Sequence, residues 1–237
     1  MFRYLCFLAV VMGVRSASAP FITPCKTGDT PCVLASAQAA VPFLAPGIPE
    51  LGIKSLDPMH FDTIKGDQGG LGLEFKDTTV TGMKNCHVDA IKHDLKKGKQ
   101  VVVIRCSVEL DGLYKLSGQL LVFPINGNGK YHITIQDIVI KASSDVSIVD
   151  GADGKKHWHV DSWKFSSETK TSAKFQFENL FGGNKLLAEP VVAFVNTSWK
   201  EVMHEVSPPI VRAIVSRVVE AVRALYDAVP AEELEIV

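Results

Sequence analysis

The stretch IVRAIVSRVVEAVRALYDAV, residues 210–229, constrains the whole fold because its apolar residues recur at the spacing of an α-helix. The apolar face is formed by Val211, Ile214, Val215, Val218, Val222, Leu225 and Val229. The polar residues fall on the opposite face: Arg212, Ser216, Glu220, Arg223 and Asp227. A helix of this kind buries one face, so the rest of the chain must supply an apolar partner of matching length.

The helical pattern extends upstream to Glu189, which gives a segment of about 60 Å at 1.5 Å per residue. The upstream part carries a second apolar set, made of Val191, Phe194, Val195, Trp199, Val202, Met203 and Val206. Pro208 and Pro209 lie between the two parts. We expect them to kink or break the helix, because proline removes a backbone hydrogen bond and clashes with the preceding turn.

The middle of the chain, residues 51–181, alternates apolar and polar residues as β-strands do. In QVVVIRCSVELDG, residues 100–112, one face is formed by Val102, Ile104, Cys106, Val108 and Leu110. The sequence Asn-Gly-Asn-Gly at 126–129 predicts a hairpin turn between two further strands. TKTSAKFQFENLF, residues 169–181, predicts another strand with Phe175 and Phe177 on one face.

No long helical pattern interrupts these strands, which favours an antiparallel meander over a parallel sheet. The sheet is then the apolar partner of the C-terminal helix. We therefore predict an α+β fold in which a highly curved antiparallel sheet, a super-roll, wraps one long helix. The mean hydropathy is positive, so the chain needs either a large core or an apolar cavity. A rolled sheet leaves a tubular apolar space, a tunnel that suits an elongated apolar ligand.

The N-terminus has the pattern of a cleavable secretory signal over residues 1–19. Arg3 precedes an apolar run that is shorter than the roughly 20 residues needed to span a bilayer, and small residues follow it. The alternatives are a buried N-terminal helix and a membrane anchor. We expect a secreted, extracellular protein whose residues 20–237 form one domain, without stable insertion in a membrane.

Four cysteines remain after the signal, and an even number in a secreted chain favours disulfides over a zinc site. Three pairings exist, and we expect Cys25–Cys32 and Cys86–Cys106. The first would clip the N-terminal arm to a helix over 31–44, as a clasp beside the tunnel mouth. The second follows from a hairpin folded near residue 96, which sets Cys86 opposite Cys106. Free buried thiols are the alternative for the second pair.

Other motifs point to no catalytic or metal chemistry, and we expect neither a cofactor nor a metal. The near-neutral charge of −1, without a basic stripe, argues against nucleic acid. His157-Trp158-His159 lacks a third metal ligand and is interpreted as a solvated strand surface. The glycine-rich stretch 69–72 precedes a strand, so it is no dinucleotide site. Asn196 begins a glycosylation sequon inside the predicted helix, where access is poor.

Several segments resemble, in the right order, the juvenile hormone binding and takeout proteins of insects. They are GIPELGIKSLDPM (47–59), GLYKLSGQLLVFPINGNG (112–129), FENLFGGNKLLAEPVVAFVNTSWKEV (177–202) and the C-terminal VPAEELEIV. A Cys86–Cys106 bridge is not part of the usual pattern of that family. The resemblance implies the same roll around a helix, a haemolymph setting and a non-enzymatic carrier of terpenoid or fatty acid-like ligands. Some relatives are under circadian or feeding control.

We therefore expect a monomeric carrier of an elongated hydrophobic small ligand. The alternative is a secreted takeout-like signalling or interaction protein without a transport role, and an enzyme acting on juvenile hormone is the weakest hypothesis. Alternation along the strands and helix suggests twelve residues that line the tunnel: Leu73, Phe75, Val88, Val102, Ile104, Leu120, Val122, Ile133, Ile135, Phe194, Trp199 and Met203.

Overall fold

The structure is a computed structural model that describes residues 19–68, 70–94 and 97–236; the predicted signal at 1–19 lies outside it except for Ala19. Six strands form one antiparallel sheet in the order β2-β3-β5-β6-β7, and β4 pairs with the first part of β5. The strands are β2 (Met59–Gln68), β3 (Leu71–Thr81), β4 (His87–Asp94), β5 (Lys99–Leu120), β6 (Phe123–Asp150) and β7 (Lys156–Phe177).

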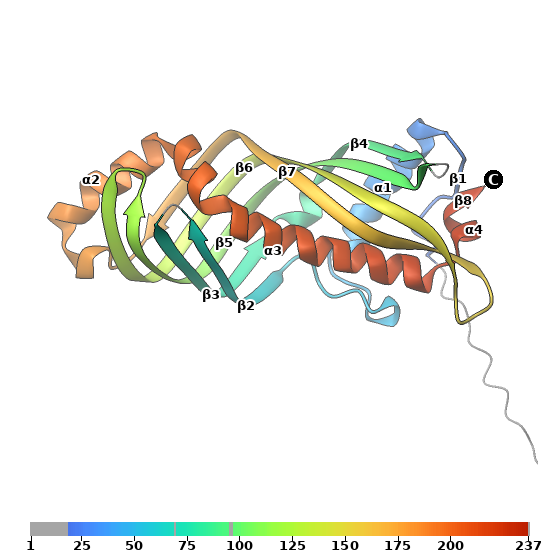
Figure 1. Cartoon of the computed structure of the whole chain (residues 1–237), viewed down its shortest axis with the longest axis horizontal. Helices are drawn as coiled ribbons and strands as arrows, with labels where there is room; N and C mark the ends of the chain where they lie inside the picture. The colour runs from blue at the N-terminus through green and yellow to red at the C-terminus, as the bar shows by residue number, and fades with distance from the viewer. Residues whose placement is uncertain (1–18, 69, 95–96, 237) are drawn as a thin grey trace, which may run out of the picture.

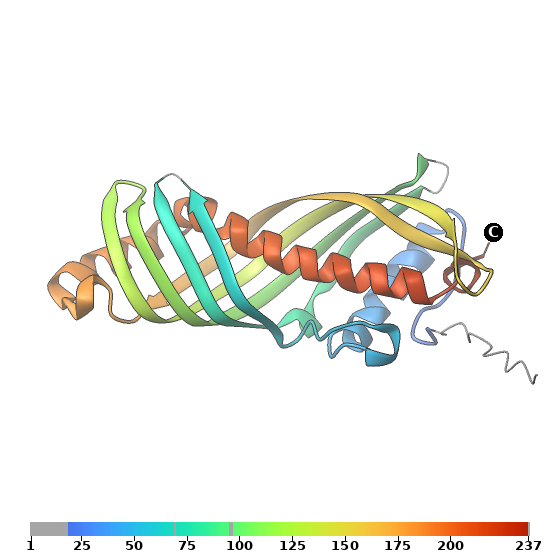
Figure 2. The same cartoon turned by 60° about the horizontal axis from the view of Figure 1, so that its bottom comes forward.

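The long helix α3 (Trp199–Ala228) closes the open side of this curved sheet (Figures 1 and 2). Strands β2 and β7 stand at the two ends of the strand order, and α3 packs against both of them. The predicted apolar face points inward, since Val211, Ile214, Val215, Leu225 and Val229 are buried. The α+β roll around a helix is therefore confirmed, with the helix rather than a strand pairing filling the gap between the sheet edges.

Of the kink or break expected at the two prolines, the break is absent. Helix α3 runs continuously through Pro208 and Pro209, and the interruption lies at Ser198, between α2 (Lys185–Thr197) and α3. An interior proline costs about 3 kcal/mol, but here the turn around it is held by burial of Val206 and Ile210. Gly66 of β2 leaves room for the proline: a Cβ there would lie 2.7 Å from Cγ of Pro209.

The predicted hairpin turn at 126–129 is also misplaced. Strand β5 turns into β6 at Leu121 and Val122, and 126–129 lies inside β6, paired with 114–117 of β5. Glycine is required at these positions because neighbouring residues come too close to β6 to leave room for a side chain, not because the chain turns there. A Cβ on Gly127 would lie 2.7 Å from the Tyr114 hydroxyl, and one on Gly129 would lie 2.8 Å from the Glu178 carbonyl.

Short elements gather at the end of the molecule opposite α2 (Figure 1). Helix α1 (Thr30–Leu44) is capped by Asp29, whose Oδ1 accepts from the Cys32 amide at 3.1 Å. Strand β1 (Cys25–Lys26) pairs in parallel with β8 (Glu235–Ile236), which follows α4 (Ala231–Leu234). The remaining elements are short 3-10 helices: η1 (Pro49–Leu51), η2 (Met83–Asn85) and η4 (Phe181–Gly183); of these, η4 directly precedes α2 at the other end of the molecule.

Both expected disulfides are present in the structure. Cys25–Cys32 joins the N-terminal arm to the first turn of α1, and the pairing of β1 with β8 adds the C-terminal segment to this clasp. Cys86–Cys106 has Cα atoms 4.4 Å apart and continues the register that places His87 opposite Arg105. The two bridges thus fasten the same end of the molecule, where α1 lies beside β4.

Candidate functional site

A largely apolar cavity of ≈ 330 Å³ lies at the α1 end of the molecule. Its walls come from the inner faces of α1 and of β4 to β7, from the second half of α3 and from the segment around β8. The N-terminal clasp is part of the wall, since Cys25 lines the cavity. This volume is at the lower end of the range of about 300–1,000 Å³ that is typical of small-molecule sites.

The cavity exists because small side chains occupy positions where larger ones would fill the roll. Six of its lining residues are alanine or serine: Ser36, Ala37, Ala40, Ala45, Ala142 and Ser144. Ser36 is held by a local contact, since its Oγ accepts from the Thr23 amide at 2.9 Å. The other lining residues are mostly branched aliphatic, so the surface offered to a ligand is chiefly hydrocarbon.

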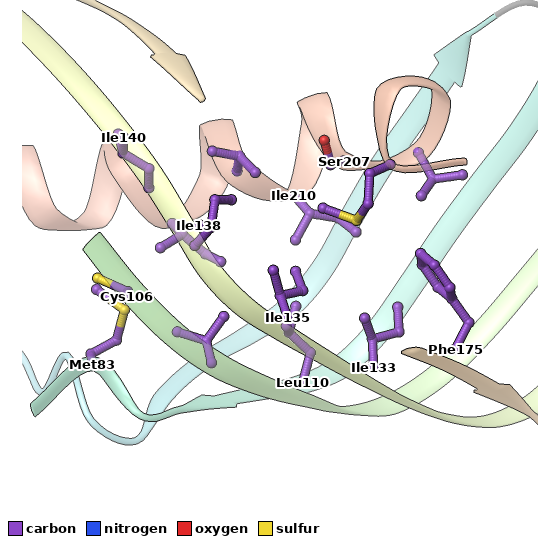
Figure 3. Close-up of a pocket in the computed structure, with 15 residues that line it drawn as sticks. Met83, Cys106, Leu110, Ile133, Ile135, Ile138, Ile140, Phe175, Ser207 and Ile210 are labelled. Atoms are coloured by element: carbon purple, nitrogen blue, oxygen red, sulfur yellow. The ribbon is translucent and has the colours of Figure 1, made fainter. Parts of the chain in front are cut away.

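A second cavity of ≈ 30 Å³ lies deeper in the roll, between α3 and strands β5 to β7 (Figure 3). Its volume suffices for about one water molecule, but its walls are almost entirely hydrocarbon. Four residues line both cavities: Met83, Cys106, Ile140 and Ile214. We call these four the partition. The interior of the roll therefore holds a large and a small apolar cavity that adjoin at these four side chains.

One end of the larger cavity carries polar groups. Strands β4, β5 and β6 place His93, Gln100 and Ser144 in consecutive register, and Tyr226 of α3 faces them. Gln100 Nε2 donates to His93 Nδ1 at 3.2 Å and to the Tyr226 hydroxyl at 2.9 Å. Trp158 packs on this group, stacked on His93 at 4.5 Å and edge-on to Tyr226 at 5.2 Å between ring centroids. We call His93, Gln100, Ser144 and Tyr226 the polar row.

Burial controls the protonation of the polar row. Gln100 and Tyr226 are each 7% exposed. Burial raises the pKa of Tyr226 to about 12, so the hydroxyl keeps its proton. Burial also lowers the pKa of His93, against the smaller opposing effects of the Glu235 and Asp94 carboxylates. The imidazole is therefore a neutral acceptor at neutral pH, consistent with the hydrogen bond that its Nδ1 accepts.

His157 is not part of a solvated surface, which corrects the interpretation of the His-Trp-His motif. It is 3% exposed, and its Nε2 lies 3.1 Å from a carboxylate oxygen of Asp153. Its Nδ1 donates to the Tyr226 carbonyl at 3.0 Å. His157 therefore anchors the last turn of α3 to the β6–β7 hairpin. Within the described ranges, no three histidine, cysteine or acidic residues are grouped as metal ligands would be.

The structure distributes the twelve predicted lining residues over several environments. Val88, Val102 and Ile104 line the larger cavity, and Ile133, Ile135 and Met203 line the smaller one. A third group is buried or half-buried in the packed core: Leu73, Phe75, Leu120, Phe194 and Trp199. Val122 is wrongly predicted to face inward: it is 72% exposed, because the hairpin turns at that residue.

The sequence patterns did not predict that α1 forms one wall of the larger cavity, or that the polar row faces it. The run of small residues at 35–40, ASAQAA, is a signal for the first, because a helix with so few large side chains fills little volume. Nothing local marks Tyr226 or Gln100, which meet across 126 positions of sequence.

Asn196 has a structural role that explains its position in the helix. Its Nδ2 donates to the Phe175 carbonyl at 3.0 Å, and its Oδ1 accepts from the Phe175 amide at 2.8 Å. The side chain thus satisfies the backbone of the edge strand β7 as a neighbouring strand would. The amide nitrogen that a glycan would modify is already committed to this contact, in agreement with the expected poor access of the sequon.

Comparisons with known proteins place this fold. The family model described as haemolymph juvenile hormone binding protein matches residues 4–235. The circadian clock-controlled protein daywake of Drosophila melanogaster is 27% identical, covering 92% of this chain and 89% of its own. The juvenile hormone-binding protein of Manduca sexta is 26% identical over 52% of this chain and 60% of its own. No helix in the described part of the chain has the length and apolar character to cross a bilayer.

The architecture agrees with a solved structure. The crystal structure of Epiphyas postvittana Takeout 1 superposes with a TM-score of 0.88 and 27% identity, covering 91% of this chain and 100% of that one. The similarity therefore extends over the roll, the long helix and both ends of the molecule.

Proposed function

This chain belongs to the haemolymph juvenile hormone binding protein family, and we propose that it is a secreted, non-enzymatic carrier that holds one small hydrophobic ligand in the larger cavity. The observation that carries this proposal is the cavity itself, ≈ 330 Å³ in volume and walled chiefly by hydrocarbon. Each ~100 Å² of apolar ligand surface removed from water there would contribute about 2.5 kcal/mol to binding.

Relatives support the choice of ligand class. One relative is named for juvenile hormone, and a protein of Schistocerca gregaria, 18% identical, is named a putative β-carotene-binding protein. Both names refer to lipophilic molecules. We propose a terpenoid or similar lipid that fits the larger cavity, bound by a protein that acts as a monomer. The two disulfides agree with the proposed secretion, since such bridges persist in oxidising compartments.

A signalling or interaction role is the second candidate, because the daywake relatives are named as controlled by the circadian clock. An enzymatic role has less support. Among the residues described, the titratable groups that line the larger cavity are His93, Tyr226 and Glu235. His93 Nδ1 is bound to the Gln100 amide, not to a hydroxyl that it could activate as a general base.

Native mass spectrometry of the secreted protein, followed by organic extraction, tests the carrier proposal. We expect one lipophilic molecule per chain, and displacement of a fluorescent naphthylamine probe by that extract. Ala37→Phe should abolish probe binding by filling the cavity, because Ala37 lines it. Ala39→Phe is the matched control, since Ala39 is exposed on the same helix. An empty protein that also takes up no probe would favour the interaction role.

A further inference from the structure

Four polar residues that line the larger cavity lie together in the polar row, and we infer that this row binds the head group of an uncharged, oxygen-containing lipid and discriminates against the carboxylate of the same chain length. This inference rests on the proposed carrier function and specifies its ligand. The first support is the arrangement of rows across the sheet. Beside the row His93–Gln100–Ser144 lies the row Ile91–Val102–Ala142, which is entirely apolar. A ligand tail would lie on the apolar row while its head meets the polar one.

Tyr226 supplies the donor. Its oxygen accepts from Gln100 Nε2 at 2.9 Å, and its own hydrogen is donated to Gln100 Oε1 at the longer distance of 3.2 Å. A carbonyl or ether oxygen of a ligand would replace Gln100 Oε1 as the acceptor of this hydrogen. Because burial keeps this hydroxyl protonated, the donor persists at every physiological pH. Ser144, opposite Gln100, brings a second hydroxyl to the same row.

The charges around the row disfavour an anion. Within the described ranges, the residues that line the larger cavity include no lysine and no arginine, whereas Glu235 adds a carboxylate. Arg223 is on the same helix, but its guanidinium donates to the Val160 carbonyl at 3.1 Å and is not part of the lining. A ligand carboxylate would therefore be buried without a counter-ion, which is costly unless the group takes up a proton.

The test compares three probes of one chain length at neutral pH: methyl laurate, laurate and dodecane, each competing with the naphthylamine probe. In the unmodified protein we expect the affinity to decrease from methyl laurate to dodecane to laurate. Laurate should bind at least ten-fold more weakly than the ester. Tyr226→Phe should weaken methyl laurate about five-fold, the loss of one hydrogen bond. It should leave dodecane unchanged, because the phenylalanine ring keeps the volume.

Tyr131→Phe is the matched control. Tyr131 is a buried tyrosine whose hydroxyl donates to Thr78 Oγ1 at 2.8 Å, away from the larger cavity. The Tyr131→Phe substitution should leave the affinities for methyl laurate, laurate and dodecane unchanged. Laurate binding as tightly as the ester, or an unchanged ester-to-dodecane ratio in Tyr226→Phe, would overturn the inference and leave the carrier function standing. Failure of all three probes to bind would overturn the carrier function together with it.

Discussion

Strands β5, β6 and β7 run through both ends of the roll, but the two ends are filled in opposite ways. At the α2 end, aromatic rings pack against each other: Phe75 on Tyr131 at 5.0 Å and Tyr114 on Phe177 at 4.9 Å between centroids. At the α1 end, alanine and serine face the interior and leave ≈ 330 Å³ open. We call these the packed end and the cavity end. Their difference shows that side-chain volume, not backbone topology, decides which part of the roll can hold a ligand.

Truncation at the packed end should have the largest effect on stability. Phe75 is 2% exposed, so Phe75→Ala should lower the free energy of unfolding by about 3–5 kcal/mol, because it removes buried surface and leaves a new cavity. Urea titration followed by fluorescence measures this. Trp163→Ala provides the comparison at the cavity end, where Trp163 is half-buried and already borders open space. An equal or greater loss in Trp163→Ala would contradict the contrast between the ends.

Removing part of the partition should change the ligand length that the cavity end accepts. Met83→Ala takes away an unbranched side chain that lines both cavities, and it should join them. We expect the affinity for methyl palmitate to rise several-fold relative to methyl laurate, measured by probe displacement. Met203→Ala is the control, since Met203 lines only the smaller cavity of the two. The same change of preference in both variants would show that Met83 does not separate the cavities.

Acid should weaken the cavity end first, and this is the smallest effect of the three. Burial lowers the pKa of His93 below its ordinary 6.5, so the unfolded chain binds this proton more readily than the folded one. The free energy of unfolding is therefore unaffected by this group above pH 6.5, where His93 is neutral in both states. It declines as the pH falls from 6.5 toward the lowered pKa of the folded protein. Hydrogen exchange of β4 amides should accelerate over that window. His93→Gln should remove this pH dependence; an unchanged profile would exclude His93 as its source.

Much of the architecture could be predicted from local patterns. Periods of a few residues predict the apolar face of α3 and the alternation of apolar and polar residues in β5. They also predict the hairpin register that brings Cys86 to Cys106. The errors arose where distant packing overruled a local preference. Pro208 and Pro209 stay helical because the flanking Val206 and Ile210 are buried and Pro209 packs on Gly66 of β2. Gly127 lies within a strand because Leu180 crosses it.

The sequence by itself determined the α+β roll, the two disulfides and the apolar character of the interior, because each follows from the spacing of residue types along the chain. Only the tertiary structure decided where space remains and which polar groups face it. A cavity is the difference between the volume that the backbone encloses and the volume that side chains from distant segments fill, and no local pattern contains that difference. No local pattern contains the polar row either, since Gln100 and Tyr226 are 126 positions apart in the sequence and meet only in the folded protein.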